Sequence, residues 1–287
     1  MSRQEVLERE RRWAFPAAIA AIAASPLYIV SVVLDQAGDV PTTGLDTERY
    51  RAIDAAGVEL VGAVVLRGLA FALLCLPLLY LFRAAQARSE RVSGPMVGFA
   101  FVGPILLAAQ GVIGFIAQGG VASDFVAQAG PGGDVFTLLD DLQEESTAFD
   151  VATNLLFPAI LGMLVAMVYI TLQAMRAGLL TRFFGTLGMA LGAGMLFIVP
   201  AIALLTIAIW FGWLGFVILD RVPKGRPPAW DAGVAIPWPR PGEETTEAPR
   251  ELGDGEAAEA GMDEDETPRD HSARRERARK RKRKRRR

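Results

Sequence analysis

Four long apolar stretches limit what this chain can fold into. Each contains about 20 residues with at most one charge, which is the length that an α-helix needs to cross the roughly 30 Å hydrocarbon core of a membrane. They lie at residues 14–34, 60–82, 96–117 and 151–175. No alternating strand pattern accompanies them. The sequence therefore predicts an all-α fold, a polytopic bundle of transmembrane helices.

The first stretch has to be distinguished from a cleavable signal peptide. Its apolar run is longer than the hydrophobic region of about 7–15 residues in such peptides. Pro26 also directly follows the Ala-Ala-Ser triplet that a peptidase would have to cut. We therefore expect this stretch to remain in the protein as its first span.

The apolar run from Phe183 to Leu219 can be interpreted as one crossing or two. As a single helix its 37 residues would be about 55 Å long, nearly twice the hydrocarbon thickness. Pro200 interrupts the run, and proline breaks the helical hydrogen-bond ladder. Two short spans, at residues 183–199 and 201–219, fit better. The sequence thus predicts a six-span membrane domain over residues 1–221.

Basic residues near the ends of the spans predict how the bundle is oriented. With six spans and a cytoplasmic start, 13 lysines and arginines flank the inner ends, whereas only Arg49 and Arg51 flank the outer ends. Membrane proteins show this excess of positive charge on the cytoplasmic side. We therefore expect a multi-pass protein of the plasma membrane with both termini in the cytoplasm.

The spans contain few side chains that could take part in catalysis or bind a metal ion. The only histidine is His271, near the C-terminus, and the only cysteine is Cys75, in the middle of the second span. The chain has no phosphate-binding loop, no zinc-protease motif and no serine-hydrolase motif. The sequence therefore predicts no catalytic residue, no metal site and no cofactor, and it favours a protein without enzymatic activity.

Arg67 is the one charged residue inside the predicted spans. It lies about two turns from the outer end of the second span, where a charge is costly unless it is paired or reaches water. Candidate partners at a similar depth are Asp150, Asn154 and Glu59. Two interpretations remain open: an arginine that holds helices together, and a contact for a solute or anion in an outward-facing cavity.

The segment "GTLGMALGAG" contains Gly188 and Gly192, which form a Gly-x-x-x-Gly pair. The segment lies within an apolar span and follows no strand, so it does not fit a nucleotide-binding loop. Small residues at this spacing let two helices approach closely. We predict that the pair serves helix packing.

Two segments of different composition follow the last span. Residues 222–241 are rich in proline and include Trp230 and Trp238, which predicts a stiff juxtamembrane spacer with tryptophans near the headgroups. Residues 242–287 have few aliphatic or aromatic side chains, so they are predicted to form a disordered cytoplasmic tail.

The tail is a polyampholyte that carries opposite charges in separate blocks. Residues 243–270 contain 12 acidic side chains, and residues 274–287 contain 12 basic ones. Such a basic block is predicted to bind anionic lipid headgroups or an unknown protein partner. Sequence-specific nucleic-acid binding is not expected, because the tail has no aromatic side chain to stack on bases. The residues proposed to bind are Arg279, Lys280, Arg281, Lys282, Arg283, Lys284, Arg285, Arg286 and Arg287.

The order of motifs in the second half of the chain resembles a known family. "MRAGLLTRFFGTLGMALGAGMLFI" is followed by a tryptophan-containing last span, then by "GRPPAW" and "IPWP". Over residues 96–240 this resembles uncharacterised six-helix integral membrane proteins of actinobacteria, known as a domain of unknown function. The resemblance implies a six-helix fold in a bacterial cell membrane. It assigns no activity and no site residue.

Three classes of function are compatible with these features. The first is a non-enzymatic membrane protein whose cytoplasmic tail binds lipid or a partner. The charged tail and the lack of catalytic motifs in the spans favour this class. The second is a small-solute permease with an outward-facing polar site around Arg67. The third is a membrane-embedded lipid-modifying enzyme, for which the sequence supplies no convergent polar site. A polar cavity at Arg67 would favour the second class.

Overall fold

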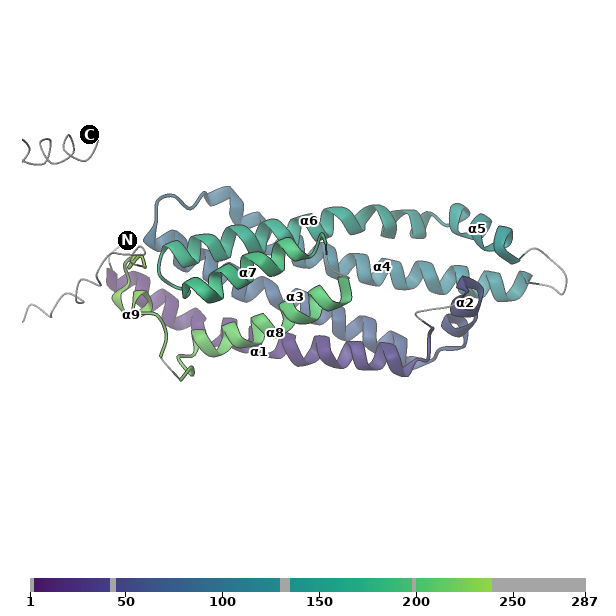
Figure 1. Ribbon diagram of the computed structural model, residues 1–287, viewed down its shortest axis with the longest axis horizontal. Helices are drawn as coiled ribbons and strands as arrows, with labels where there is room; N and C mark the ends of the chain where they lie inside the picture. The colour runs from purple at the N-terminus through teal and green to yellow at the C-terminus, as the bar shows by residue number, and fades with distance from the viewer. Residues whose placement is uncertain (1–2, 42–44, 130–134, 198–199, 224, 239–287) are drawn as a thin grey trace, which may run out of the picture. The chain divides into compact units, whose positions relative to one another are not determined.

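The computed structural model describes residues 3–41, 45–129, 135–197, 200–223 and 225–238, and every regular element in these ranges is helical. This confirms the predicted all-α fold. The predicted disordered tail, residues 242–287, lies outside the described residues. The elements, shown in Figure 1, are α1 (Arg3–Ala37), α2 (Asp46–Ala55), α3 (Val58–Arg88), η1 (Gly94–Gly98), α4 (Phe99–Gln128), α5 (Val135–Glu145), α6 (Thr147–Arg176), α7 (Arg182–Gly194), α8 (Pro200–Ile218) and α9 (Ala229–Ala232).

Four helices are long and apolar enough to cross a membrane: α1, α3, α4 together with the preceding η1, and α6. They contain the four stretches that the sequence predicts as spans. Each also has proline inside it, which packed membrane helices tolerate because neighbouring groups satisfy the freed carbonyls. These prolines are Pro16 and Pro26 in α1, Pro77 in α3, Pro104 in α4 and Pro158 in α6.

The apolar run at residues 183–219 forms two shorter helices, and the second of them begins at Pro200. α8 has 19 residues and is about 28 Å long, whereas α7 has 13 residues and is about 20 Å long. α7 ends at Gly194, before the end of the fifth predicted span at residue 199. On its own, α7 is therefore shorter than the roughly 30 Å hydrocarbon core.

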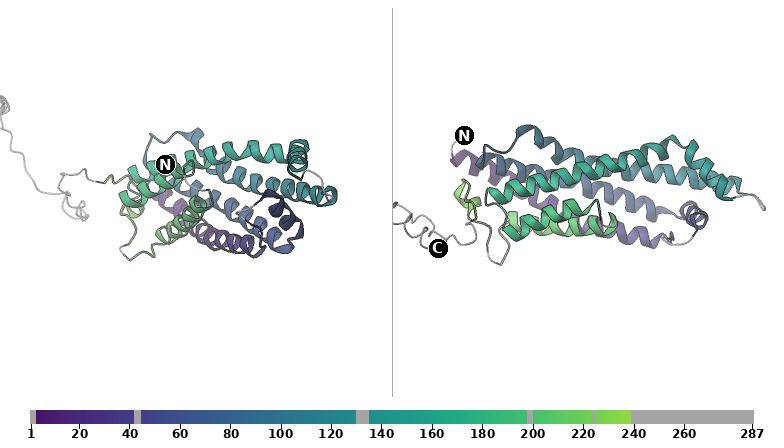
Figure 2. Two further views of the ribbon diagram at one scale, coloured as in Figure 1. Left: turned by 45° about the vertical axis from the view of Figure 1, so that its right-hand side comes forward. Right: turned by 45° about the horizontal axis from the view of Figure 1, so that its top comes forward.

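α3 packs against α1, α4, α6 and α8 (Figure 1). It therefore connects the pair α1 and α8 with the pair α4 and α6. α1 also packs along α8, α4 packs along α6, and α7 packs between α6 and α8 (Figure 2). α1 and α3 are antiparallel, because Glu10 pairs with Arg88 and Asp35 pairs with Arg67. Because α1 packs along α8, these two helices are direct neighbours although they are far apart in the sequence.

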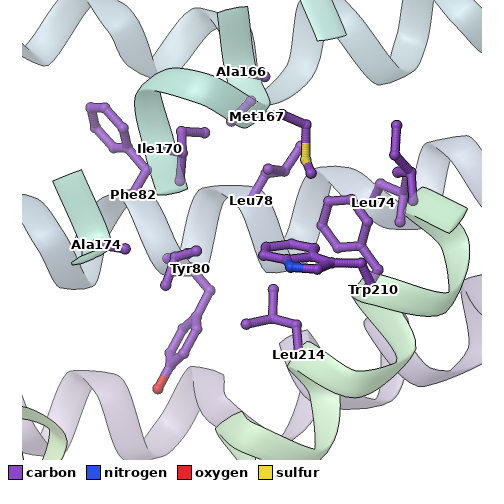
Figure 3. Close-up of a cluster of buried hydrophobic side chains, with 14 of the residues drawn as sticks. Leu74, Leu78, Tyr80, Phe82, Ala166, Met167, Ile170, Ala174, Trp210 and Leu214 are labelled. Atoms are coloured by element: carbon purple, nitrogen blue, oxygen red, sulfur yellow. The ribbon is translucent and has the colours of Figure 1, made fainter. Parts of the chain in front are cut away.

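The centre of the bundle is apolar. Large side chains of α3, α6 and α8 meet there, including Leu78, Phe82, Met167 and Ile170, which are at most 1% exposed (Figure 3). Trp210 of α8 stacks on Phe184 of α7, with ring centroids 4.7 Å apart. Cys75 is buried as well, which fits a packing role for its small side chain. The middle of the bundle is therefore packed mainly with apolar side chains.

α4 and α6 cross at two glycines that the sequence analysis did not single out. A β-carbon at Gly103 would lie 2.6 Å from the backbone nitrogen of Met163, and one at Gly162 would lie 3.1 Å from the α-carbon of Gly103. These distances leave no room for a side chain at Gly103. The crossing is thus a close backbone contact of the kind that small residues allow in membrane helices.

α2 and α5 form a separate small cap on the far end of α4. Tyr50 and Ile53 of α2 pack against Phe125 of α4 and Leu139 of α5 in their own hydrophobic cluster. Arg51 of α2 lies over the ring of Phe125, 5.8 Å from its centroid. The cap is therefore fixed to the bundle by apolar and cation–π contacts.

At the other end of the bundle, residues 225–238 form a segment that we call the C-terminal strap. It includes α9 and packs against the turn between α6 and α7. The indole nitrogen of Trp230 donates to the carbonyl of Leu179, and that of Trp238 donates to the carbonyl of Leu180, both at 2.8 Å. The backbone nitrogen of Ile236 donates to the carbonyl of Ala177 at 3.2 Å. Over its described part, the predicted spacer at residues 222–241 is a packed segment rather than a free one.

Gly178 shows how closely the strap and the turn fit. Its φ of +78° is in the left-handed region, which glycine adopts without steric cost. A β-carbon at this position would lie 2.1 Å from the carbonyl oxygen of Ile236. Glycine is required here both for the turn and for the contact with the strap.

Candidate polar site

Arg67 forms an ion pair with Asp35, at the end of α1. Its Nη2 atom donates to the Asp35 carboxylate at 2.9 Å. The sequence analysis had named Asp150, Asn154 and Glu59 as candidate partners. In the structure Asn154 donates to the backbone carbonyl of Asp150 within α6, and Glu59 lies in the first turn of α3. Asp35 takes the role because α1 is the helix that packs along this part of α3.

The Arg67 guanidinium is only partly satisfied by this pair. The side chains of Arg67 and Asp35 are 27% and 46% exposed, so the pair is open to solvent. Nε of Arg67 is buried and has no hydrogen-bond partner within the described part of the chain. A guanidinium has five N–H donors in a planar fork. Arg67 therefore retains donors for a further acceptor.

A cavity of about 410 Å³ opens beside this ion pair. It lies between α1, α3 and α4, with α2 contributing to its wall. Its apolar wall includes Ile53, Leu60 and Phe115. Its polar lining consists of Asp35, Gln36, Arg49, Arg67, Gln110 and Gln118.

The polar groups of the cavity come from four helices that converge at one end of the bundle. Arg49 of α2 donates through Nη2 to the side-chain oxygen of Gln118 on α4, at 3.4 Å. Gln110 and Gln118 are eight residues apart on α4, so they lie on the same helix face. With two guanidinium groups and one carboxylate, the lining has a net positive charge. It thus combines cationic donors with neutral amides.

The cap holds α2 in position over this site. Gln143 of α5 donates to the hydroxyl of Tyr50 at 3.3 Å, next to the apolar contacts described above. Burial raises the pKa of the Tyr50 phenol, an effect that nearby Arg49 partly offsets. Tyr50 therefore remains neutral throughout the physiological range and acts as a hydrogen-bonded packing residue.

The charged and amide side chains of the cavity can hydrogen-bond to a bound molecule. Among the described residues, no three His, Cys, Asp or Glu side chains come together in a way that could hold a metal ion. The titratable groups of the cavity are Asp35 and two arginines, and Asp35 is already paired with Arg67. What the cavity offers is a set of fixed donors to a small acceptor-bearing molecule.

The other residues that the sequence analysis named lie elsewhere. Gly188 and Gly192 of α7 face α6: a β-carbon at Gly188 would lie 2.8 Å from the Thr171 methyl group, and one at Gly192 would lie 2.6 Å from the Met167 β-carbon. Trp230 is 2% exposed and belongs to the strap. The basic residues of the tail, 279–287, are outside the described residues.

Asp35, Arg49 and the two glutamines of α4 were not predicted as site residues from the sequence. A signal for Gln110 was present, because it is a polar residue inside the apolar stretch 96–117, whereas Gln118 follows directly after that stretch. Asp35 carried no such signal, since it lies at the end of the first stretch, among the polar residues of a predicted loop. Its role depends on how α1 meets α3.

The fold and the site together define a class: an all-helical protein with four helices able to cross a membrane and a polar cavity at one end of the bundle. No protein-family model matches the chain, and the comparisons with curated proteins and with solved structures give no match either. The resemblance to six-helix actinobacterial membrane proteins therefore stays a prediction.

Proposed function

We propose that this protein is a bacterial plasma-membrane protein of the permease class, which binds a small anionic solute in the cavity at Arg67. The observation that carries this proposal is the polar cavity itself. It places Arg49 and Arg67 around a space of about 410 Å³, a size that suits a small ligand. Guanidinium groups recognise carboxylate and phosphate oxygens through paired N–H donors. A small carboxylate or phosphate is thus the ligand class that fits.

The proposed membrane position follows from the two ion pairs between α1 and α3. Glu10 and Asp35 are 25 residues apart on α1, and Arg67 and Arg88 are 21 residues apart on α3. The two pairs are thus about 32–38 Å apart along the helices, slightly more than the hydrocarbon thickness. One pair lies at each boundary of the membrane in this proposal. The Arg67 cavity then opens at the outer surface.

The proposed topology keeps both termini in the cytoplasm. A β-carbon at Gly233 in the strap would lie 3.1 Å from the Cγ atom of Arg3, so the first and last described segments are at the same end of the bundle. The excess of basic residues at that end supports a cytoplasmic location. α7 and α8 form the fifth and sixth spans of this proposal, with α7 as a short span. The tail then continues into the cytoplasm, where its predicted binding to anionic lipid or a partner would take place.

Ligand-induced stabilisation of the purified full-length protein tests the binding proposal. The probes are inorganic phosphate, succinate and an uncharged polyol, added at increasing concentrations while the melting temperature is recorded. The two anions are expected to raise the melting temperature with saturation, and the polyol is not. Arg67→Gln and Arg49→Gln are expected to weaken anion binding by about tenfold or more, since each removes charge-assisted hydrogen bonds.

Two further variants make this test specific. Arg12→Gln removes an exposed arginine of α1 that does not line the cavity, so its anion affinity should equal that of the wild type. Asp35→Asn removes the carboxylate that competes for Arg67 and should tighten anion binding. Equal losses in Arg12→Gln and Arg67→Gln, or no saturable effect of either anion, would refute the proposed site.

A further inference from the structure

A second cavity, of about 330 Å³, lies between α1 and α3 at the end of the bundle opposite the Arg67 site. α1 contributes Arg9 and Trp13 to its lining, and α3 contributes Leu76, Leu79, Tyr80 and Arg83. Among the described residues, only those of α1 and α3 line it. We call this cavity the α1–α3 groove.

The groove is polar at one end and apolar at the other. Because α1 and α3 are antiparallel, Arg9 near the start of α1 and Arg83 near the end of α3 lie at the same end. Leu76 and Ala17 line the other end, seven residues from Arg83 and eight from Arg9 respectively. The groove therefore changes from cationic to apolar over about 10–12 Å of helix length.

The acidic residue of the described lining is already paired. Glu10 is the one acidic residue that the described lining contains, and both of its carboxylate oxygens accept hydrogen bonds from the buried Arg88. Glu10 and Arg88 thus neutralise each other. Arg83 is exposed and makes no hydrogen bond or ion pair with another residue of the described part. The exposed guanidinium of Arg83 therefore leaves positive charge at the rim of the groove, and Arg9 of α1 lines the same end.

The position of the groove matches a membrane interface. Trp13 is 53% exposed and lies between the arginine end and the apolar end, as tryptophans do at the level of lipid headgroups. In the membrane position proposed above, on which this inference rests, the arginines are at the cytoplasmic boundary and the apolar end faces the hydrocarbon.

We propose that the α1–α3 groove binds one phospholipid with an anionic headgroup. Arg9 and Arg83 donate to the headgroup phosphate, and the indole of Trp13 lies beside the glycerol region. An acyl chain packs along Leu76, Leu79 and the ring of Tyr80. Basic pockets between helices on the cytoplasmic side are a recurring form of anionic-lipid recognition. This site belongs to the folded bundle and is separate from any lipid binding by the tail.

The test measures lipid bound to the full-length protein in detergent micelles by native mass spectrometry. The ligands are phosphatidylglycerol, phosphatidylcholine and glycerol phosphate, and the last distinguishes a lipid site from a site for free phosphate. We expect saturable binding of one phosphatidylglycerol, weaker binding of phosphatidylcholine and no competition by glycerol phosphate. Arg83→Gln and Arg9→Gln should each weaken phosphatidylglycerol binding by about fivefold.

Arg12→Gln is the matched control, because Arg12 is an exposed arginine of α1 that does not line the groove. All variants carry the same tail, so tail binding contributes equally to each of them. Leu79→Ala should weaken phosphatidylglycerol binding without changing its preference over phosphatidylcholine. The proposal is overturned if Arg12→Gln loses as much binding as Arg83→Gln, or if glycerol phosphate displaces the lipid. Unchanged melting temperatures of the variants exclude loss of fold as the cause.

Discussion

Arg88 of α3 donates hydrogen bonds to both carboxylate oxygens of Glu10 on α1, and its side chain is completely buried. Its Nε atom also donates to the carbonyl of Ala229 in the strap, at 3.1 Å, and the guanidinium lies over the Trp230 ring, 5.7 Å from its centroid. One arginine thus connects the first helix, the third helix and the C-terminal strap.

Removing one partner of this pair should destabilise the bundle strongly. Arg88→Gln leaves the Glu10 carboxylate buried without its counter-charge, a change that costs about 3–5 kcal/mol. For a domain of this size, the melting temperature should fall by about 6 °C or more. Thermal unfolding of the purified protein in detergent measures the change. Arg91→Gln, which alters an exposed arginine just beyond α3, should have little effect, and an equal loss in both variants would contradict this account.

Gly178→Ala should release the strap from the bundle. An alanine β-carbon at this position would overlap the carbonyl oxygen of Ile236, and the left-handed backbone conformation adds strain. Chymotryptic cleavage after Trp230, which is buried in the native protein, measures release. Cleavage should be faster in Gly178→Ala than in the wild type.

Gly120→Ala is the control for this substitution, since a β-carbon at Gly120 in α4 meets no atom within 4 Å. It should leave the rate of cleavage after Trp230 unchanged. Equal rates in Gly178→Ala and the wild type would show that the turn accommodates the added methyl group.

The cap should respond to alkaline pH through Tyr50. Burial raises the pKa of this phenol above its ordinary value of about 10, so the folded state favours the neutral form. The stability that this preference contributes is complete below pH of about 10 and is lost as the pH rises through the raised pKa. The late-titrating part of the phenolate absorbance during a pH titration should be smaller in Tyr50→Phe than in the wild type. If Tyr50→Phe leaves the titration curve unchanged, the assignment is wrong.

Reporter fusions test the proposed topology. Fusions after Arg88, Arg176 and Arg240 should report a cytoplasmic location, and fusions after Asp46 and Asp134 an external one. An external signal after Arg240 would contradict the six-span topology. It would also remove the cytoplasmic setting of both the strap and the α1–α3 groove.

The long helices were predictable because their signal is local. Length and apolar composition alone identify the stretches that became α1, α3, α4 and α6. The start of α8 at Pro200 follows from the chemistry of proline in the same way. The early end of α7 at Gly194 had no comparable signal, because apolar residues continue beyond it.

The partners of the polar residues were not predictable, because they depend on helix packing. Depth in the membrane made Asp150 a reasonable partner for Arg67, but depth does not say which helix is adjacent, and the adjacent helix presents Asp35. The strap shows the same limit. Its prolines and tryptophans are typical of a spacer at the membrane surface. The sequence does not indicate that the two indoles donate hydrogen bonds to the carbonyls of Leu179 and Leu180.

The packing of α8 against α1 has a consequence for how the protein is made. A β-carbon at Gly215 of α8 would lie 2.5 Å from a side-chain atom of Ile22, so α8 packs in close contact with α1. Synthesis delivers α1 to the membrane first and α8 last, with the strap later still. Until the chain has been synthesised through residue 238, α1 lacks its contacts with α8 and the strap. A chain that ends early therefore exposes an incomplete helix face within the membrane, where cellular quality control can recognise it.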